Sequence, residues 1–129
     1  HFTGDGSFHM NLNEGCTAVS YDLPIITIIL DNKVLGMVYQ WQNLLYNGRY
    51  SETKLGASPD FVKLAESFGV NATRITKPGE TKEALKSAIK DNEPILLDVI
   101  IDKDETLPMV PPGAAIDEMI GEYKLEKDV

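Results

Sequence analysis

Cysteine is nearly absent from the sequence. Cys16 is the single cysteine among 129 residues, so no disulfide can form within the chain. This scarcity favours a reducing compartment, and we expect a cytoplasmic protein. No sequence signature for a nucleophile surrounds Cys16, which is predicted to be a small core residue.

Long apolar runs and positive charge are also scarce. The longest apolar run, residues 24–30, is far too short to cross a bilayer, and no signal-peptide pattern is present. The 12 Lys and Arg residues are outnumbered by 20 Asp and Glu residues, for a formal net charge of −8. Binding to nucleic acid or to an anionic membrane surface is therefore disfavoured, and the acidic excess favours solubility.

The chain is short and reaches a glycine-rich motif almost at once. Its length allows one domain at most, and it begins at His1 without a starting Met. We therefore expect a truncated protein. Residues 1–129 are predicted to be one partial domain, with residues 102–129 as a C-terminal tail.

Apolar runs mark the predicted strands. Residues 24–30 and 94–101 are apolar almost throughout, which is typical of strands buried on both faces of a parallel sheet. Residues 70–76 predict a short strand, and residues 1–4 the end of another. Helices are predicted at residues 11–21, 35–46, 61–68, 81–90 and 114–123. This alternation predicts an α/β fold, a mostly parallel sheet flanked by helices.

Local signals add detail to these elements. Gly4 and Gly6 are available for positive φ in a tight turn, Asn11 and Asp60 are predicted helix caps, and Gly69 is a predicted stop. Residues 47–59 are predicted to be irregular. The residues predicted to face inward are Leu12, Cys16 and Val19; Phe61, Leu64, Ala65 and Phe68; and Ala84, Leu85, Ala88 and Ile89.

Two polar motifs follow predicted strands, Gly4-Asp5-Gly6 and Asp31-Asn32. Residues 7–30 are enough for one helix and a returning strand, which places both motifs at the same edge of the sheet. A carboxylate, an amide oxygen and a backbone carbonyl just after Asn32 suit Mg²⁺, and the glycines let the main chain approach a diphosphate. The alternative for Gly-Asp-Gly alone is a plain strand-to-helix turn.

Together the two motifs resemble the thiamine diphosphate motif, a Gly-Asp-Gly that ends in Asn-Asn. Asp31 stands where the first Asn is usual, while the second Asn, the metal ligand of that family, is present as Asn32. Further blocks resemble the catalytic subunits of acetolactate synthases, and the resemblance covers nearly the whole chain. These blocks are residues 4–11, 35–42, 50–51 and 108–114. The resemblance implies the thiamine-diphosphate-binding fold, truncated at its N-terminal side.

The resemblance also implies a set of site residues. Asp5, Asn32 and the carbonyl of Val34 would hold Mg²⁺, and Val38 and Trp41 would line the pocket for the acceptor substrate. The implied cofactor-binding residues are Gly4, Asp5, Gly6, Ser7, Asn32, Val34, Leu35, Gly36 and Met37. No catalytic side chain is assigned to this chain; His9 is not placed in that role, and Lys33 is expected to point to solvent.

The implied activity is that of a transferase in branched-chain amino-acid biosynthesis. It joins two pyruvates, or pyruvate and 2-ketobutyrate, with loss of CO₂, using thiamine diphosphate and Mg²⁺, and FAD in the full-length enzyme. A dimer or tetramer and a regulatory small subunit are the expected partners. The chain alone is expected to be inactive, because the activating glutamate and the FAD-binding domain lie elsewhere in the family.

Three other interpretations remain open from the sequence. The chain is compatible with another thiamine diphosphate decarboxylase, oxidase or carboligase. It is also compatible with a structural fragment that binds no cofactor and has an open sheet edge. A flavodoxin-like or receiver-like domain is disfavoured, because Asp5 is isolated and no lysine is expected at a suitable strand end.

Overall fold

A computed structural model describes residues 1–105 and 107–120 of the chain. The chain divides into two compact units, each described below by itself. The first contains His1–Lys33 and Leu55–Ile101, and the second contains Val34–Lys54 and the chain from Asp102 onward. No helix in the described ranges is both long and apolar enough to span a membrane.

A four-stranded parallel sheet forms the centre of the first unit, as the apolar runs predict. The strands are β1 (Phe2–Gly4), β2 (Ile26–Asp31), β3 (Asn71–Ile75) and β4 (Ile95–Ile100). Their order across the sheet is β1-β2-β4-β3, and every pair is parallel. The two longest apolar runs therefore become the two inner strands, where both faces are covered.

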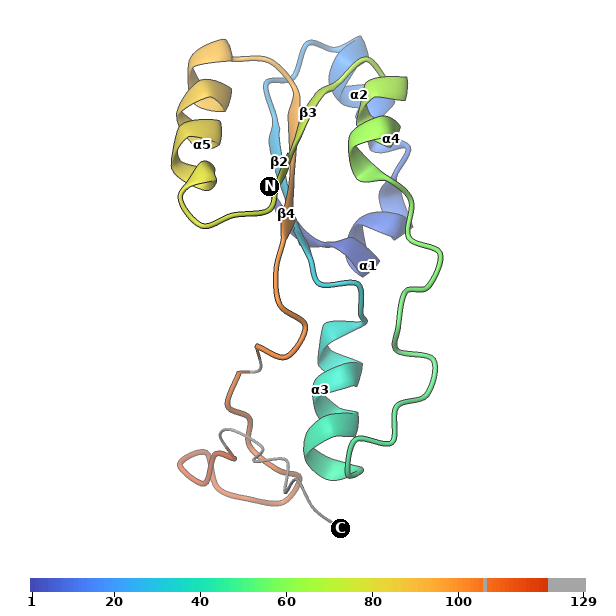
Figure 1. Ribbon diagram of the computed structural model, residues 1–129, viewed down its shortest axis with the longest axis vertical. Helices are drawn as coiled ribbons and strands as arrows, with labels where there is room; N and C mark the ends of the chain where they lie inside the picture. The colour runs from blue at the N-terminus through green and yellow to red at the C-terminus, as the bar shows by residue number, and fades with distance from the viewer. Residues whose placement is uncertain (106, 121–129) are drawn as a thin grey trace. The chain divides into compact units, whose positions relative to one another are not determined.

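Helices cover both faces of this sheet (Figure 1). One face carries α5 (Glu80–Asp91), and the other carries α1 (Asp5–Phe8), α2 (Glu14–Ser20) and α4 (Phe61–Ser67), with the 3-10 turn η1 (His9–Asn11) between α1 and α2. Asp60 caps α4 by accepting a hydrogen bond from the Lys63 N–H, and Gly69 follows the helix at φ 82°. The predicted cap and stop of this helix are confirmed.

The core has two layers because successive strand residues point to opposite faces. Ile29 and Leu96 face α4 and pack with Phe61, while Ile28 and Leu97 face α5. Of the predicted inward residues, those that join the two layers are Leu12, Val19, Phe61, Leu64, Ala65 and Phe68, with Ala84 and Leu85 on the other side. Ala88 is also buried.

Several local predictions are wrong. Gly4 is extended at φ −86°, Asp5 begins a helix, and neither Gly4 nor Gly6 has a positive φ, so the motif is a helix start and not a tight turn. The next α-helix begins at Glu14, and its N-cap is Asn13 instead of Asn11. The 3-10 turn shifts the helical phase, so Cys16 is exposed instead of buried.

Two further predictions differ from the structure. Ile89 is 68% exposed, because the contact between α5 and the sheet is made by the narrower stripe that contains Ala84 and Leu85. Residues 114–120 form turns and one isolated bridge, between Met109 and Ile120, and not a helix. The remainder of that predicted helix, residues 121–123, lies outside the described residues.

The second unit contains the helix α3 (Gly36–Leu45), as predicted, and the irregular segment that follows it. Tyr39 is the buried residue of α3, with 4% of its surface exposed. Its ring stacks on Tyr50 at 4.3 Å between centroids, and its hydroxyl donates to Asp104 at 2.8 Å. One side chain of α3 thus holds two segments that are far apart in the sequence.

Candidate functional site

The polar motifs meet at the carboxyl ends of β1 and β2. Gly4 pairs with Leu30 in the sheet, so Asp5 and Asp31 each follow a residue of that pair on adjacent strands. In open parallel sheets this edge is where ligands bind. The prediction that both motifs lie at the same edge of the sheet is confirmed.

Asp5 and Asp31 are buried side by side at this edge. They are 1% and 0% exposed, respectively. The N–H of Lys33 donates to Asp5 Oδ2 at 2.9 Å and to Asp31 Oδ1 at 3.3 Å. A single donor shared by two carboxylates shows that the turn after β2 folds back over the first motif.

Lys33 closes this turn and does not simply point to solvent. Its φ of 61° is in the left-handed region, and its ammonium forms an ion pair with Asp31 Oδ2. The same ammonium lies 5.5 Å from the centroid of the Phe61 ring, a distance suited to a cation–π contact. The side chain is half exposed, so the expectation that it points to solvent holds for only part of it.

The paired carboxylates alter the electrostatics of the first motif. Burial raises the pKa of Asp5, and the hydrogen bond and negative charge of Asp31 raise it further. Two neighbouring buried carboxyls disfavour full ionisation unless a cation is bound beside them. The arrangement is thus suited to a divalent cation with oxygen ligands.

The other predicted residues of the first unit surround this position. Gly4 has open space where a Cβ would be, with no atom within 4 Å, which permits close approach of a ligand. Gly6 and Ser7 lie in α1, and Ser7 is exposed. Asn32 follows Asp31 directly and is half buried.

The remaining predicted residues belong to the second unit. Val34 is buried at 3% exposure and forms an isolated bridge with Lys54. Leu35 precedes α3, and Gly36 is its first residue. Three predicted residues of α3 are exposed: Met37 at 75%, Val38 at 45% and Trp41 at 38%.

A third buried carboxylate, Asp98, is not predicted as a site residue from the sequence. It lies on β4 opposite Arg74 of β3, whose Nε donates to Asp98 Oδ2 at 2.9 Å. Arg74 also reaches Asp60 Oδ1 at 2.7 Å. Burial raises the pKa of Asp98 despite the opposing effect of Arg74. The available signal was an acid in the middle of an otherwise apolar strand.

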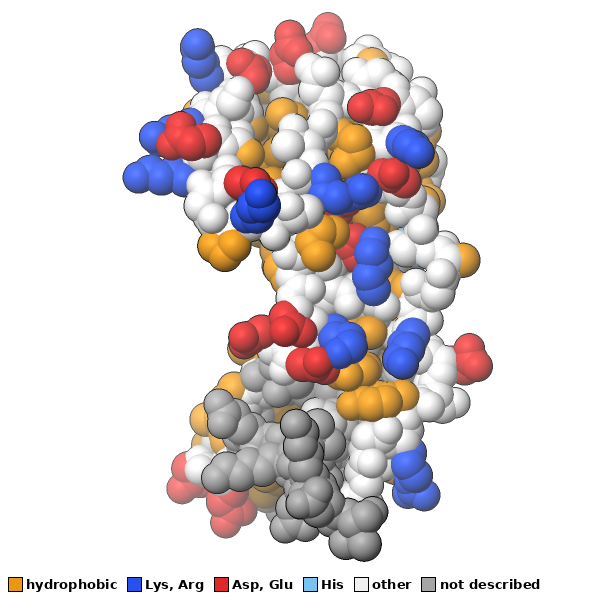
Figure 2. Space-filling view, viewed as in Figure 1, with side chains coloured by type: hydrophobic (Ala, Val, Ile, Leu, Met, Phe, Trp, Pro, Cys, Tyr) orange, Lys and Arg blue, Asp and Glu red, His pale blue; other side chains and the backbone are white. Residues whose placement is uncertain are grey.

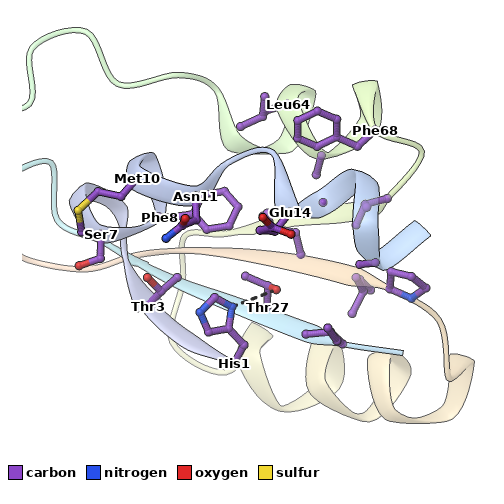
Figure 3. Close-up of a pocket in the computed structure, with 18 residues that line it drawn as sticks. His1, Thr3, Ser7, Phe8, Met10, Asn11, Glu14, Thr27, Leu64 and Phe68 are labelled. Atoms are coloured by element: carbon purple, nitrogen blue, oxygen red, sulfur yellow. Dashed lines mark hydrogen bonds between the residues drawn. The ribbon is translucent and has the colours of Figure 1, made fainter. Parts of the chain in front are cut away.

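A pocket of about 470 Å³ lies between the strands and the helices on the α4 side of the sheet (Figure 3). Figure 3 shows Thr3 and Thr27 from the strands on one side of it, and Phe8, Leu64 and Phe68 from the helices on the other. Ile25 and Ile95 also line it, which places it toward the amino ends of β2 and β4. Ser7, a predicted cofactor-binding residue, is among its lining residues, but Asp5, Asp31 and Asn32 are not, so the pocket borders the predicted site without containing the proposed cation position.

The face of the molecule drawn in Figure 2 has no continuous basic patch over the first unit. Figure 2 shows Lys and Arg side chains interspersed with Asp and Glu over the elements of the first unit. Within residues 1–105 and 107–120, no three His, Cys, Asp or Glu side chains are grouped to hold a metal ion. A cation at Asp5 therefore needs neutral oxygens and ligand oxygens to complete its coordination.

Comparison with protein families identifies the domain that contains this edge of the sheet. Residues 1–99 match the model for the C-terminal TPP binding domain of thiamine pyrophosphate enzymes. The chain belongs to this family. Its parallel sheet, its Gly-Asp-Gly motif and the turn after β2 are thus parts of a thiamine-pyrophosphate-binding domain.

Individual relatives agree with the resemblance noted from the sequence. The chain is 56% identical over 98% of its length to a probable acetolactate synthase large subunit of Methanocaldococcus jannaschii. It is 45% identical over 92% of its length to the acetolactate synthase isozyme 2 large subunit of Escherichia coli. The chain covers 22% of the length of each of these two relatives and 20% of a similar protein of Methanococcus aeolicus, about a fifth in each case.

A solved structure confirms the fold. The thiamine diphosphate-dependent 4-hydroxybenzoylformate decarboxylase of Rhodococcus jostii RHA1 superposes with a TM-score of 0.73 and 30% sequence identity. The match covers 81% of this chain and 20% of that enzyme. The predicted fold class, a parallel sheet flanked by helices in a thiamine-pyrophosphate-binding domain, is confirmed.

Proposed function

We propose that this chain is the diphosphate- and Mg²⁺-binding part of an acetolactate synthase large subunit. The whole protein would join two pyruvates, or pyruvate and 2-ketobutyrate, into a 2-acetohydroxy acid with loss of CO₂. Similarity to acetolactate synthase large subunits over 98% of the chain supports this reaction. The observation that carries the proposed site is the buried Asp5 carboxylate, held against the turn after β2 by the Lys33 N–H.

The donor set at this edge fits a hard divalent cation. Asp5 supplies a buried carboxylate, and Asn32 follows the neighbouring strand with an amide oxygen. The carbonyl of Val34, two positions further along the sequence, is proposed as the third protein ligand. Diphosphate oxygens would complete the shell, and Gly4, Gly6 and Ser7 would contact the diphosphate itself. Gly4 has the open space that such an approach requires.

Thiamine diphosphate, when bound, supplies the stabilised carbanion that this carbon–carbon chemistry requires. The proposed roles of this chain are to bind and orient. Asp5 and Asn32 anchor the cation, and Leu35, Gly36 and Met37 lie along the cofactor. Val38 and Trp41, both exposed at the start of α3, offer apolar surface to the acceptor substrate.

Other parts of the reaction are proposed to reside outside these 129 residues. The relatives are about five times as long as the chain, which supports this division. FAD binding, a dimeric or tetrameric assembly and a regulatory small subunit are proposed for the whole protein. We place the whole protein in the cytoplasm and expect the chain alone to be inactive.

A calorimetric titration of thiamine diphosphate with Mg²⁺ tests the proposed site. The chain should bind both together, and Asp5→Asn should abolish binding, because an amide cannot replace the anionic ligand. Asp91→Asn makes the same chemical change at an exposed position on α5 and should bind normally. Equal binding by Asp5→Asn and the wild type would refute the site.

A second reaction class is supported by the structural match to a decarboxylase at 30% identity. In that case the whole protein would release an aldehyde from a 2-keto acid instead of joining two keto acids. Product analysis of the full-length protein with pyruvate separates the two, since acetolactate and acetaldehyde are chemically distinct.

A further inference from the structure

The carboxyl end of β2 carries a carboxylate that the proposed Mg²⁺ site does not use. Asp5 is the proposed anionic ligand, and Asp31 is a second buried carboxylate that shares the Lys33 N–H with it. An unbalanced second charge would change the affinity of the site for any cation. The structure shows a compensating charge in the same turn.

Lys33 engages both oxygens of Asp31. Its N–H donates to Oδ1, and its ammonium pairs with Oδ2. The left-handed φ of 61° directs the main chain and the side chain of Lys33 back toward the same carboxylate. The Phe61 ring, which is fully buried, lies 5.5 Å from the ammonium and limits where it can move.

We propose that Lys33 is a positioning residue that neutralises the charge of Asp31 and fixes its carboxylate beside the cation site. The site then has the net charge of Asp5 alone, as though residue 31 were an amide. This inference rests on the proposed cation site at Asp5. It assigns to Asp31 and Lys33 opposite effects on cation affinity, which cancel in the wild type.

Opposite effects follow from removing each member of the pair. Lys33→Met leaves two buried carboxylates beside the cation, which should tighten divalent cation binding by about tenfold. Asp31→Asn leaves an unpaired ammonium beside the cation, which should weaken binding by about tenfold. The double variant Asp31→Asn/Lys33→Met restores neutrality and should bind within about twofold of the wild type.

Mn²⁺ titration followed by electron paramagnetic resonance tests the inference, with thiamine diphosphate present at a fixed concentration. Lys33→Arg keeps the charge and should bind like the wild type. Lys86→Met removes an exposed lysine on α5 and controls for the change in net charge. Far-UV circular dichroism establishes that each variant is folded; if Lys33→Met is not, Asp31→Asn and the double variant decide the question.

The outcomes separate this inference from the proposed function. Absence of Mn²⁺ binding that depends on Asp5 in the wild type would overturn both. Binding that depends on Asp5, with weaker affinity in both single variants and no recovery in the double variant, would overturn the inference alone. That pattern is expected if Lys33 only stabilises the fold of the turn.

Discussion

Burial and charge conflict at the side chain of Asp98. Its side chain is fully buried on β4, it pairs with Arg74, and its Oδ1 has no hydrogen-bond partner among the described residues. Burial raises its pKa above the usual 3.8. Between the unfolded and the folded pKa, the folded protein therefore binds a proton that the unfolded chain has released.

This conflict predicts a pH dependence of stability. Because the folded pKa is the higher one, the contribution of Asp98 is fully present below pH 3.8 and is lost as the pH rises through the folded pKa. Asp98→Asn should therefore lose less stability than the wild type between pH 4 and pH 7. Urea unfolding at a series of pH values measures this, and parallel pH profiles would contradict it.

At the same scale, motif residues were predictable and their supporting partners were not. The spacing of the two motifs predicts that they lie at the same edge of a parallel sheet, and the pairing of β1 with β2 confirms this position. The contact of Lys33 with Asp31 depends on a positive φ that no local sequence signal requires. The partner of Asp98 depends on the register of β3 and β4, which pairs positions distant in sequence.

Among the elements, strands were predicted more accurately than helix phases. β2 and β4 follow from their apolar runs, whose burial on both faces leaves little ambiguity. In the helix predicted from residue 11, Leu12 and Val19 face the core as predicted but Cys16 does not, and a 3-10 turn at His9–Asn11 precedes the α-helix that begins at Glu14. Such a turn changes which residues face the core without changing the apolar pattern.

The contact between α2 and α4 depends on Gly15. A Cβ at this position would lie 2.6 Å from Phe68 Cδ2, well inside van der Waals contact. Alanine is intrinsically the better helix former, but overpacking should dominate here. We expect Gly15→Ala to lower the free energy of unfolding by about 1–3 kcal/mol, measured by urea denaturation.

The clash has a matched control. In a Phe68→Leu background the ring is removed, so adding Gly15→Ala should cost less than it does in the wild type. A stabilising effect of Gly15→Ala in the wild-type background would show that Phe68 moves aside freely. It would also show that helix propensity dominates at this position.

On the scale of the whole molecule, we expect this chain to bind the cofactor but catalysis to require the full-length protein. The chain contains the proposed cofactor anchor, while its relatives are about five times as long. The purified 129-residue chain should therefore form no acetolactate from pyruvate, even with thiamine diphosphate, Mg²⁺ and FAD present. A colorimetric assay for acetolactate checks this, and turnover by material free of the full-length enzyme would refute it.

The strand order also has a consequence for how the protein is made. β4 pairs with both β2 and β3, yet it is the last strand in the described part of the chain. During synthesis, β2 emerges long before its main partner, and its apolar side chains stay uncovered until residues 95–100 have left the ribosome. Parallel pairing over such a separation is slow and leaves the nascent chain open to aggregation. The sheet that places Asp5 beside Asp31 is thus completed late, and a chaperone that shields β2 in the interval would favour its formation.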